Sequence, residues 1–329
     1  MRIVHLYFVF SLWLLTMQPL RAQVPTQQEV LKEESKLILE RSIKIAERFY
    51  VMADEEDLRE ITDDILASRE TSDLLKECIM RTQRRFFLFR YPSDGFWVKG
   101  YVSLVPEPLT NPLLILLRGG NRIFGLANPA NDFSCVRNYT VLATAYRGGV
   151  SEGADEFGGD EVNDVENLIR YLPQLEQKLA LQLAPSSVSM LGVGRGAMEM
   201  FLALGRSSFL QNYVSRAASL SGVLDMPAWM RHREDVRHMF VRDFGLIPGV
   251  NEEQWIQRRN PLNAVPLIKK DLPFLIIQRT RDTRAAPEEG RTMFKKLQEN
   301  GNCVEYWEVS DGDYCLKKRM EWIADWFEK

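Results

Sequence analysis

The spacing of apolar residues changes along the chain, and each change marks a different kind of structure. From Gln27 to about Met80, apolar side chains recur every three to four positions, as in EVLKEESKLILERSIKIAERFY, which predicts helices. From Arg84 the period falls to two, in FFLFRY and FWVKGYVSLV, which predicts two strands. Residues 92–95 between them, PSDG, contain an Asp-Gly pair that suits the tight turn of a β-hairpin.

After the hairpin, short apolar runs alternate with longer helical patterns. The apolar runs predict strands over 112–117, 140–146, 187–192, 214–221, 273–279 and 303–309. The helical patterns occupy 161–180, 196–205, 287–301 and 315–329. Such alternation is typical of an α/β fold, with a mostly parallel sheet covered by helices on both faces and, here, led by an antiparallel hairpin.

Residues 223–265 interrupt the alternation with helical patterns alone, in MPAWMRHREDVRHMFVRDFG and NEEQWIQRRNPL. We expect this insertion to form a helical cap over the carboxyl ends of the parallel strands, where open α/β sheets bind ligands. Residues 81–329 are therefore expected to form one α/β domain that includes the cap. Residues 23–80 are expected to form a helical appendage packed on that domain.

Residues 1–22 predict a cleavable export signal. They combine a basic start at Arg2, an apolar stretch from about Leu6 to Leu15, and the small residue Ala22 at the expected cleavage point. The apolar part is too short to favour a membrane span, and no later stretch is apolar enough to form one. The mature chain is therefore expected to be secreted or periplasmic.

Charge and cysteine content narrow the possible classes of protein. Losing two arginines with the signal takes the formal net charge from -3 to -5, which does not suit a nucleic-acid-binding protein. Cys303 and Cys315 would lie near opposite ends of a predicted strand, which disfavours a disulfide between them. A disulfide between Cys78 and Cys135 stays open, and buried free thiols are an equally good interpretation for all four cysteines.

Several motifs, taken in chain order, resemble those of the catalytic domain of prolyl oligopeptidase-like serine peptidases. They are SDGFWVKGYV, LRGGNRIFG, AYRGGVSEGADEFGGDEVNDV, GVGRG, LSGVLD, QRTRDTRAAPEE and SDGDYCLKKRMEW, and they span roughly residues 84–329. The block YRGG…DEFGG…NDV is the most distinctive of them. The resemblance implies an α/β-hydrolase fold. We expect no β-propeller of that family before the hairpin, because this stretch is too short and has the wrong period.

The resemblance also implies where the catalytic residues of such a hydrolase should stand. The nucleophile lies at a glycine turn between a strand and a helix, as in GxSxG, and the acid and the histidine follow it along the chain. The corresponding positions here are Gly194 in GVGRG, Asp282 and Tyr314. Gly194 has no hydroxyl, and Tyr314, with an ordinary pKa of about 10, cannot replace histidine as a base at neutral pH.

Of the three catalytic positions, only the acid is retained. No histidine follows Asp282. His232 and His238 in the predicted cap are six residues apart, which does not place both on one helical face and disfavours a metal pair. No metal or cofactor is expected. Asp282 has two interpretations that the motif does not separate: it is the retained acid, or it is a loop aspartate that caps the helix beginning near Pro287.

Part of the oxyanion-binding apparatus of a hydrolase is retained as backbone. The N–H of Arg195 is one expected donor, and the loop Gly119-Gly120-Asn121 is expected to supply the other. The same glycines also have an interpretation without any ligand, because close packing of a strand against a helix needs glycine.

Three functional hypotheses follow from these residues. The first is an exported α/β-hydrolase-fold protein that has lost serine-hydrolase catalysis and either binds a peptide or acyl ligand in the old cleft or has a structural role. The second is an active peptidase or esterase with a displaced nucleophile, for which Ser221 and Cys315 are the candidates. Acidic neighbours at Asp311 and Asp313 oppose thiolate formation at Cys315. The third is a protein-interaction module that uses the N-terminal helices and the cap.

Overall fold

The computed structural model describes residues 27–53, 56–107, 112–129, 139–183, 187–310 and 316–329. The chain divides into two compact units, Met1–Leu37 and Ile38–Lys329, and the division falls within helix α1 (Gln27–Phe49). The first unit contributes the first half of that helix to the described residues. The second unit carries the sheet, the remaining helices and all the contacts discussed below.

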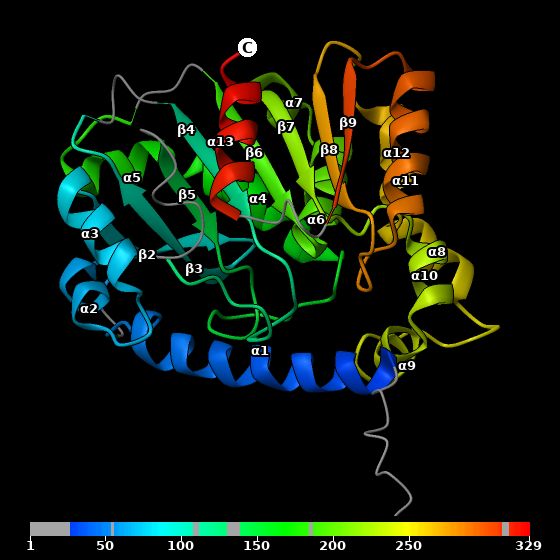
Figure 1. Cartoon of the computed structure of the whole chain (residues 1–329), viewed down its shortest axis with the longest axis horizontal. Helices are drawn as coiled ribbons and strands as arrows, with labels where there is room; N and C mark the ends of the chain where they lie inside the picture. The colour runs from blue at the N-terminus through cyan, green and yellow to red at the C-terminus, as the bar shows by residue number, and fades with distance from the viewer. Residues whose placement is uncertain (1–26, 54–55, 108–111, 130–138, 184–186, 311–315) are drawn as a thin grey trace, which may run out of the picture. The chain divides into compact units, whose positions relative to one another are not determined.

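The strands of the described residues form one nine-stranded sheet in the order β1-β2-β3-β5-β4-β6-β7-β8-β9 (Figure 1). Antiparallel pairing joins β1, β2, β3 and β5, and parallel pairing joins β5, β4 and β6 to β9. The expected mostly parallel sheet led by an antiparallel hairpin is therefore confirmed. The strands are β1 Leu58–Glu60, β2 Arg85–Ser93, β3 Phe96–Leu104, β4 Leu113–Leu117, β5 Thr140–Thr144, β6 Val188–Val193, β7 Val214–Leu220, β8 Phe274–Arg279 and β9 Val304–Val309.

The hairpin between β2 and β3 has the tight turn that its sequence predicts. Ser93 pairs with Phe96, and the two residues between them, Asp94 and Gly95, have φ angles of 49° and 86°. These left-handed values are the ones that a type I′ turn requires. Strand β1, in contrast, lies in a segment whose pattern predicts helices, and it pairs with residues 87–89 of β2. Three residues are too few to show a period of two, so pairing with β2 selects this strand.

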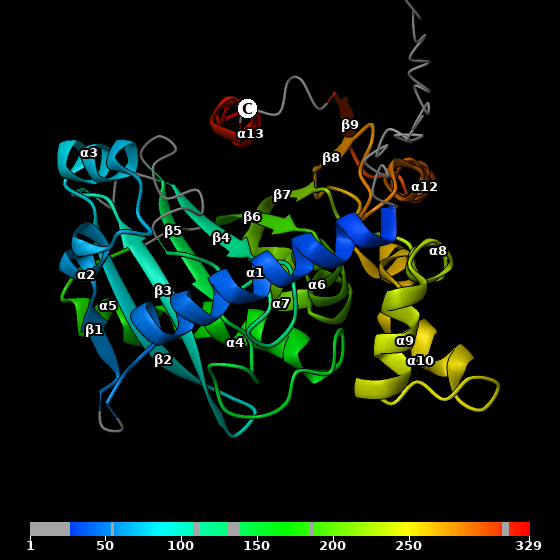
Figure 2. The same ribbon diagram turned by 60° about the horizontal axis from the view of Figure 1, so that its bottom comes forward.

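Helices cover both faces of the sheet, as expected. Outside the cap they are α2 Thr62–Ala67, α3 Asp73–Thr82, α4 Asn163–Arg170, α5 Leu172–Leu179, α6 Arg195–Arg206, α7 Ser208–Tyr213, α12 Pro287–Asn300 and α13 Leu316–Phe327, with a 3-10 turn at Asp160–Val162. Figure 2 shows α13 on one side of the central strands and α4, α6 and α7 on the other. Alternate residues of each strand enter two separate cores: in β4, Ile115 faces the α6 side and Leu116 faces the side of α13.

Helices also occupy the insertion between β7 and β8, for which we keep the name cap. It consists of α8 Met226–His232, α9 Glu234–Asp243, α10 Glu252–Arg259, α11 Pro261–Ala264 and a 3-10 turn at Val265–Leu267. None of the described helices is long and apolar enough to cross a membrane. Cys78 and Cys303 are free thiols, whereas Cys135 and Cys315 lie outside the described residues, as do the proposed signal at 1–22 and Tyr314.

Candidate functional site

The turn between β6 and α6 has the geometry of a nucleophile elbow. Gly194 stands between the strand and the helix with φ 56° and ψ -119°, a conformation that side-chain-bearing residues rarely adopt. Its N–H donates to the carbonyl of Leu220 at 3.0 Å. Its carbonyl accepts hydrogen bonds from the N–H groups of Ala197 and Val223, each at 3.1 Å. The turn is therefore fixed to the neighbouring strand β7 and to its own helix.

The three glycines of GVGRG differ in whether packing requires a glycine at their position. A Cβ atom added at Gly192 would lie 2.5 Å from the Cα of Ala197, and one added at Gly196 would overlap the carbonyl of Leu117. These two glycines are needed because strand and helix pack closely. A Cβ at Gly194 would meet no atom nearer than 3.9 Å. The middle glycine is therefore not required by packing, and the elbow keeps space for a side chain.

The loop after β4 lies beside the elbow. A Cβ built on Gly119 would be 3.8 Å from the backbone nitrogen of Arg195, which is the first residue of α6 and has no intrahelical partner for its N–H. Gly120 has φ 72°, which favours glycine. The side chain of Asn121 is directed away, since its Nδ2 lies 3.9 Å from Sδ of Met239 in the cap. Gly119, Gly120 and Arg195 are thus brought together at the elbow, and Asn121 contacts the cap.

Asp282 lies in the loop after β8, and its carboxylate is bonded within that loop. Its Oδ1 accepts hydrogen bonds from the backbone N–H groups of Arg284 at 2.8 Å and Ala285 at 3.0 Å. Its Oδ2 accepts one from Nε of Arg279 at 3.1 Å, and the side chain is 3% exposed. Since Tyr314 lies outside the described residues, the structure gives no geometry between these two positions.

Asp282 does not occupy the capping position of helix α12. The residue before α12 is Ala286, and its N–H donates to Oε1 of Glu289 in the first turn. Asp282 instead fixes the turn that precedes this helix. The carboxylate therefore has a structural role in the loop, whichever further role it has.

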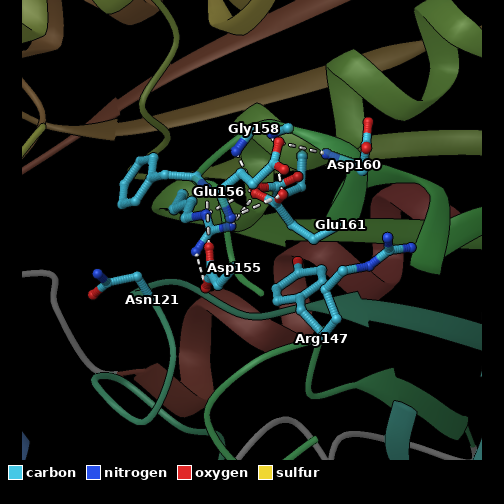
Figure 3. A network of polar contacts seen from close by, with 12 residues as sticks. Asn121, Arg147, Asp155, Glu156, Gly158, Asp160 and Glu161 are labelled. Atoms are coloured by element: carbon cyan, nitrogen blue, oxygen red, sulfur yellow. Dashed lines mark hydrogen bonds and ion pairs between the residues drawn. The ribbon is translucent and has the colours of Figure 1, made fainter. Parts of the chain in front are cut away.

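The side chain of Arg195 forms a buried charge network that the sequence motif does not reveal. Its guanidinium bonds to carboxylate oxygens of Asp155 at 2.8 Å, Glu161 at 2.6 Å and Glu199 at 2.7 Å. Each of these carboxylate side chains is 0% exposed, and the guanidinium lies 4.3 Å from the ring centroid of Phe157. In Figure 3 the side chains of Asp155 and Glu161 converge from the loop before α4. The network ties this loop to the first turn of α6.

The network contains three carboxylates and one guanidinium, so it would have a net negative charge if all three carboxylates were ionised. Burial raises the pKa of Glu199 to about 8, and the nearby carboxylates Glu161 and Asp155 add to the rise. Burial also acts to raise the pKa of Asp155, but the charge of Arg195 lowers it overall. Glu199 therefore holds a proton near neutral pH.

Aromatic side chains fill the space between this network and the cap. The ring of Phe157 lies 5.8 Å from Trp229 of α8, and 5.0 Å and 5.6 Å from Phe240 and Phe244 in and just after α9, measured between ring centroids. Phe157 is 3% exposed and has φ 60°. The cap is therefore packed directly onto the loop that the Arg195 network holds, and aromatic side chains occupy the space between them.

The opposite side of the elbow contains a cavity of about 220 Å³. Its walls come from the second half of α1, from the end of β4 and from the loop that follows β4. They include Ile38, Ser42, Ile45, Leu116, Gly119 and Val193. Ser42 joins α1 to the loop after β4, because its Oγ accepts a hydrogen bond from the N–H of Gly125 at 3.0 Å. Val193 precedes Gly194 in the chain and Gly119 lies beside it, so the cavity adjoins the elbow.

Sequence reasoning missed two parts of this site, the Arg195 side-chain network and the α1 wall of the cavity. The spacing of Arg195 and Glu199, four residues apart at the start of a predicted helix, is the one local signal for the network. No local signal places α1 beside the loop after β4, because that contact joins distant parts of the chain. Among the described residues, no cluster of histidine, cysteine or acidic side chains has an arrangement that holds a metal ion.

Comparison with known proteins supports the resemblance in the sequence. No family model matches the chain. The protein named uncharacterized peptidase YtmA of Bacillus subtilis (strain 168) is 28% identical over 229 residues, which are 69% of this chain and 84% of that protein.

Solved structures show the same fold. The structure of an acylaminoacyl peptidase has a TM-score of 0.59 and 17% identity over 75% of this chain, which spans only 41% of that peptidase. One of two esterase structures from the fungus Rhizomucor miehei matches 93% of this chain and 92% of its own, with a TM-score of 0.59 and 13% identity. The chain therefore has the α/β-hydrolase fold of these peptidases and esterases, and its sequence is similar to that of the Bacillus peptidase.

Proposed function

We propose that this chain is a non-hydrolytic α/β-hydrolase-fold protein that binds a ligand beside its former nucleophile elbow. The observation that carries the proposal is Gly194, which occupies the elbow in the strained conformation of a nucleophile but has no side chain. Serine-hydrolase chemistry needs a hydroxyl at this point and a histidine to take its proton. The sequence has no histidine after Asp282.

The expected loss of rate is large enough to decide between the hypotheses. Removing the serine alone costs on the order of a millionfold in kcat in a serine protease where this has been measured. Here the histidine is missing as well, and the carboxylate of Asp282 is bonded to its own loop. What remains of the apparatus is the pair of backbone segments at Gly119 and Arg195.

A displaced nucleophile at Ser221 has one observation in its favour and a stronger one against it. Ser221 follows β7 next to the elbow and has φ 47°, a strained value for a residue with a side chain. Its buried Oγ has no hydrogen-bond partner among the described residues. Activation of a serine needs a base at hydrogen-bond distance, and the described residues place none at Ser221, which weighs against it as a nucleophile.

The cavity favours a binding role over a purely structural one. Aromatic side chains fill the space beside Phe157, but about 220 Å³ remains open beside Gly119 and Val193. A chain kept only for its shape gains stability by filling such a space, since interiors are otherwise close-packed. The position of this opening at the elbow is the reason to assign binding to the old cleft.

Hydrolysis assays on the purified chain test the proposal. Aminoacyl-proline anilides and short acyl esters cover the peptidase activity that the name of the Bacillus relative suggests and the esterase activity of the fungal structures. We expect rates equal to those of Gly194→Ala, and no stoichiometric labelling by a fluorophosphonate probe. Hydrolysis well above that of the Gly194→Ala protein, or labelling of a single serine, would contradict the proposal.

We also propose that the protein is exported to the periplasm or the cell exterior after removal of residues 1–22. The basic start, apolar stretch and small residue of this segment support the proposal. Expression of the full chain followed by cell fractionation and N-terminal sequencing tests it. The expected result is a mature N-terminus at Gln23 in the exported fraction, and full-length chain retained inside the cell would contradict it.

A further inference from the structure

We propose that the cavity beneath α1 binds a short-chain carboxylic acid, with its alkyl chain against the apolar walls and its carboxylate toward two arginines. The inference rests on the proposed function, because it names the ligand class of that same site. It follows from the shape, charge and position of the cavity.

The charge of the cavity favours an anion. Among the described residues that line it, Arg41 and Arg118 are basic and none is acidic. Arg41 is exposed and makes no ion pair within the described part of the chain, so it lies where the cavity meets solvent. Arg118 is 4% exposed, and the hydrogen bonds of its guanidinium all go to backbone carbonyls, such as that of Ala145 at 2.7 Å.

Arg118 therefore brings a buried positive charge to the wall without a carboxylate in contact. Burial lowers the pKa of Arg118, while the charge of Asp155 acts in the opposite direction. Asp155 is itself bonded to Arg195 at 2.8 Å. An anion placed in the cavity gains from the field of Arg118 without displacing any of its hydrogen bonds, and it reaches Arg41 directly at the mouth.

The walls and the volume favour a short alkyl chain. Ile38, Ile45, Leu116, Leu126 and Ala127 supply most of the lining, and apolar burial is the main source of affinity for such a chain. A water molecule occupies about 30 Å³ in the liquid, so a cavity of about 220 Å³ holds roughly seven non-hydrogen atoms. Carboxylic acids of about four to six carbons have this size.

The position of the cavity agrees with this class of ligand. The acyl part of a hydrolase substrate lies between the elbow and the oxyanion loop, and here Val193 and Gly119 from these two segments form part of the wall. A carboxylic acid has the acyl part of an ester or amide but offers no bond to cleave. A protein without the nucleophile is therefore suited to hold it as a ligand.

Calorimetric titration of the purified chain tests the inference with butanoate, hexanoate and octanoate, each paired with its uncharged primary amide. We expect hexanoate to bind at least about fivefold more tightly than hexanamide, and added salt to reduce this ratio. Arg41→Gln is expected to weaken hexanoate about two- to fivefold without changing the amide, since exposed ion pairs contribute little. Arg48→Gln, on the same helix but outside the cavity, is the matched control.

A second variant tests the location. Ala127→Leu fills part of the cavity with three carbons, and it is expected to abolish binding of hexanoate and its amide while the protein keeps its far-ultraviolet circular dichroism. Equal affinities for acid and amide, tighter binding of N-acetyl-leucine than of hexanoate, or unchanged binding in folded Ala127→Leu would overturn the inference. If the chain both binds hexanoate and hydrolyses esters, the proposed non-hydrolytic function is wrong and this ligand assignment is kept. If it does neither, this ligand assignment is wrong and the absence of hydrolysis is kept.

Discussion

Glu199 makes the stability of this protein depend on pH near neutrality, and Glu199→Gln should remove that dependence. Its Oε1 accepts Nε of Arg195 at 2.7 Å, its Oε2 has no partner among the described residues, and the side chain is 0% exposed. Burial raises its pKa to about 8. Glutamine has the same shape, keeps the acceptor toward Arg195 and does not titrate.

The sign and size of the effect follow from linkage. Because the folded protein holds the proton more tightly than the unfolded chain, whose ordinary value is 4.5, Glu199 contributes stability at acid pH that is lost as pH rises toward 8. With 1.36 kcal/mol per pKa unit, the loss between about pH 6 and pH 8.5 is of the order of 2 to 3 kcal/mol. The variant should lack this loss.

Urea unfolding at about pH 6 and pH 8.5 for both proteins measures the difference. Glu289 is buried and its pKa is also raised to about 8, so it contributes equally to both proteins and cancels in the comparison. The free energy of unfolding of the wild type should fall by about 2 kcal/mol more than that of Glu199→Gln. Parallel behaviour of the two proteins within about 0.5 kcal/mol would refute the assignment of the proton to Glu199.

The remaining predictions concern the elbow and the loop packed on it. Arg195→Met leaves buried carboxylates without a counter-charge and should cost about 3 to 5 kcal/mol of unfolding free energy in urea titrations at pH 7. Gly194→Ser should fold, with a cost of about 1 to 3 kcal/mol for its left-handed backbone, and should leave ester hydrolysis at background because the base is missing. Gly196→Ala should yield no folded protein by circular dichroism, since its methyl group overlaps the carbonyl of Leu117. Phe157→Ala should cost about 3 to 5 kcal/mol through the cavity left among the cap aromatics.

Most of the fold could be predicted because its signals are local. Strand β4 is a continuous run of five buried apolar residues, and the hairpin turn is encoded in the Asp94-Gly95 pair. The helical pattern over 161–180 proved to be two helices, α4 and α5, joined at Tyr171. Pro173 in the first turn of α5 lacks the N–H that a continuous helix would use, which explains the break.

The parts of the site that could not be predicted depend on contacts between distant segments. The sequence locates the elbow, but Arg195 meets Asp155 and Glu161 only because the loop before α4 folds back on α6. In the same way, Ser42 of α1 accepts a hydrogen bond from Gly125, which lies 83 residues later in the chain. Sequence periodicity does not predict contacts over such a sequence separation. Charged residues in a sequence are normally assigned to the surface, so a fully buried arginine with three carboxylates contradicts the usual expectation.

The contacts at the elbow maintain its shape without a side chain at position 194. Gly192 and Gly196 are fixed by packing, and any side chain there disturbs the junction of strand and helix. Gly194 is not fixed in this way, since a Cβ would meet nothing nearer than 3.9 Å. The elbow keeps its shape because the Arg195 network and the hydrogen bond to Leu220 hold it, and neither needs a nucleophile. The scaffold therefore holds the loop after β4 and a cavity beside an elbow without a hydroxyl, which is the arrangement that the proposed binding role requires.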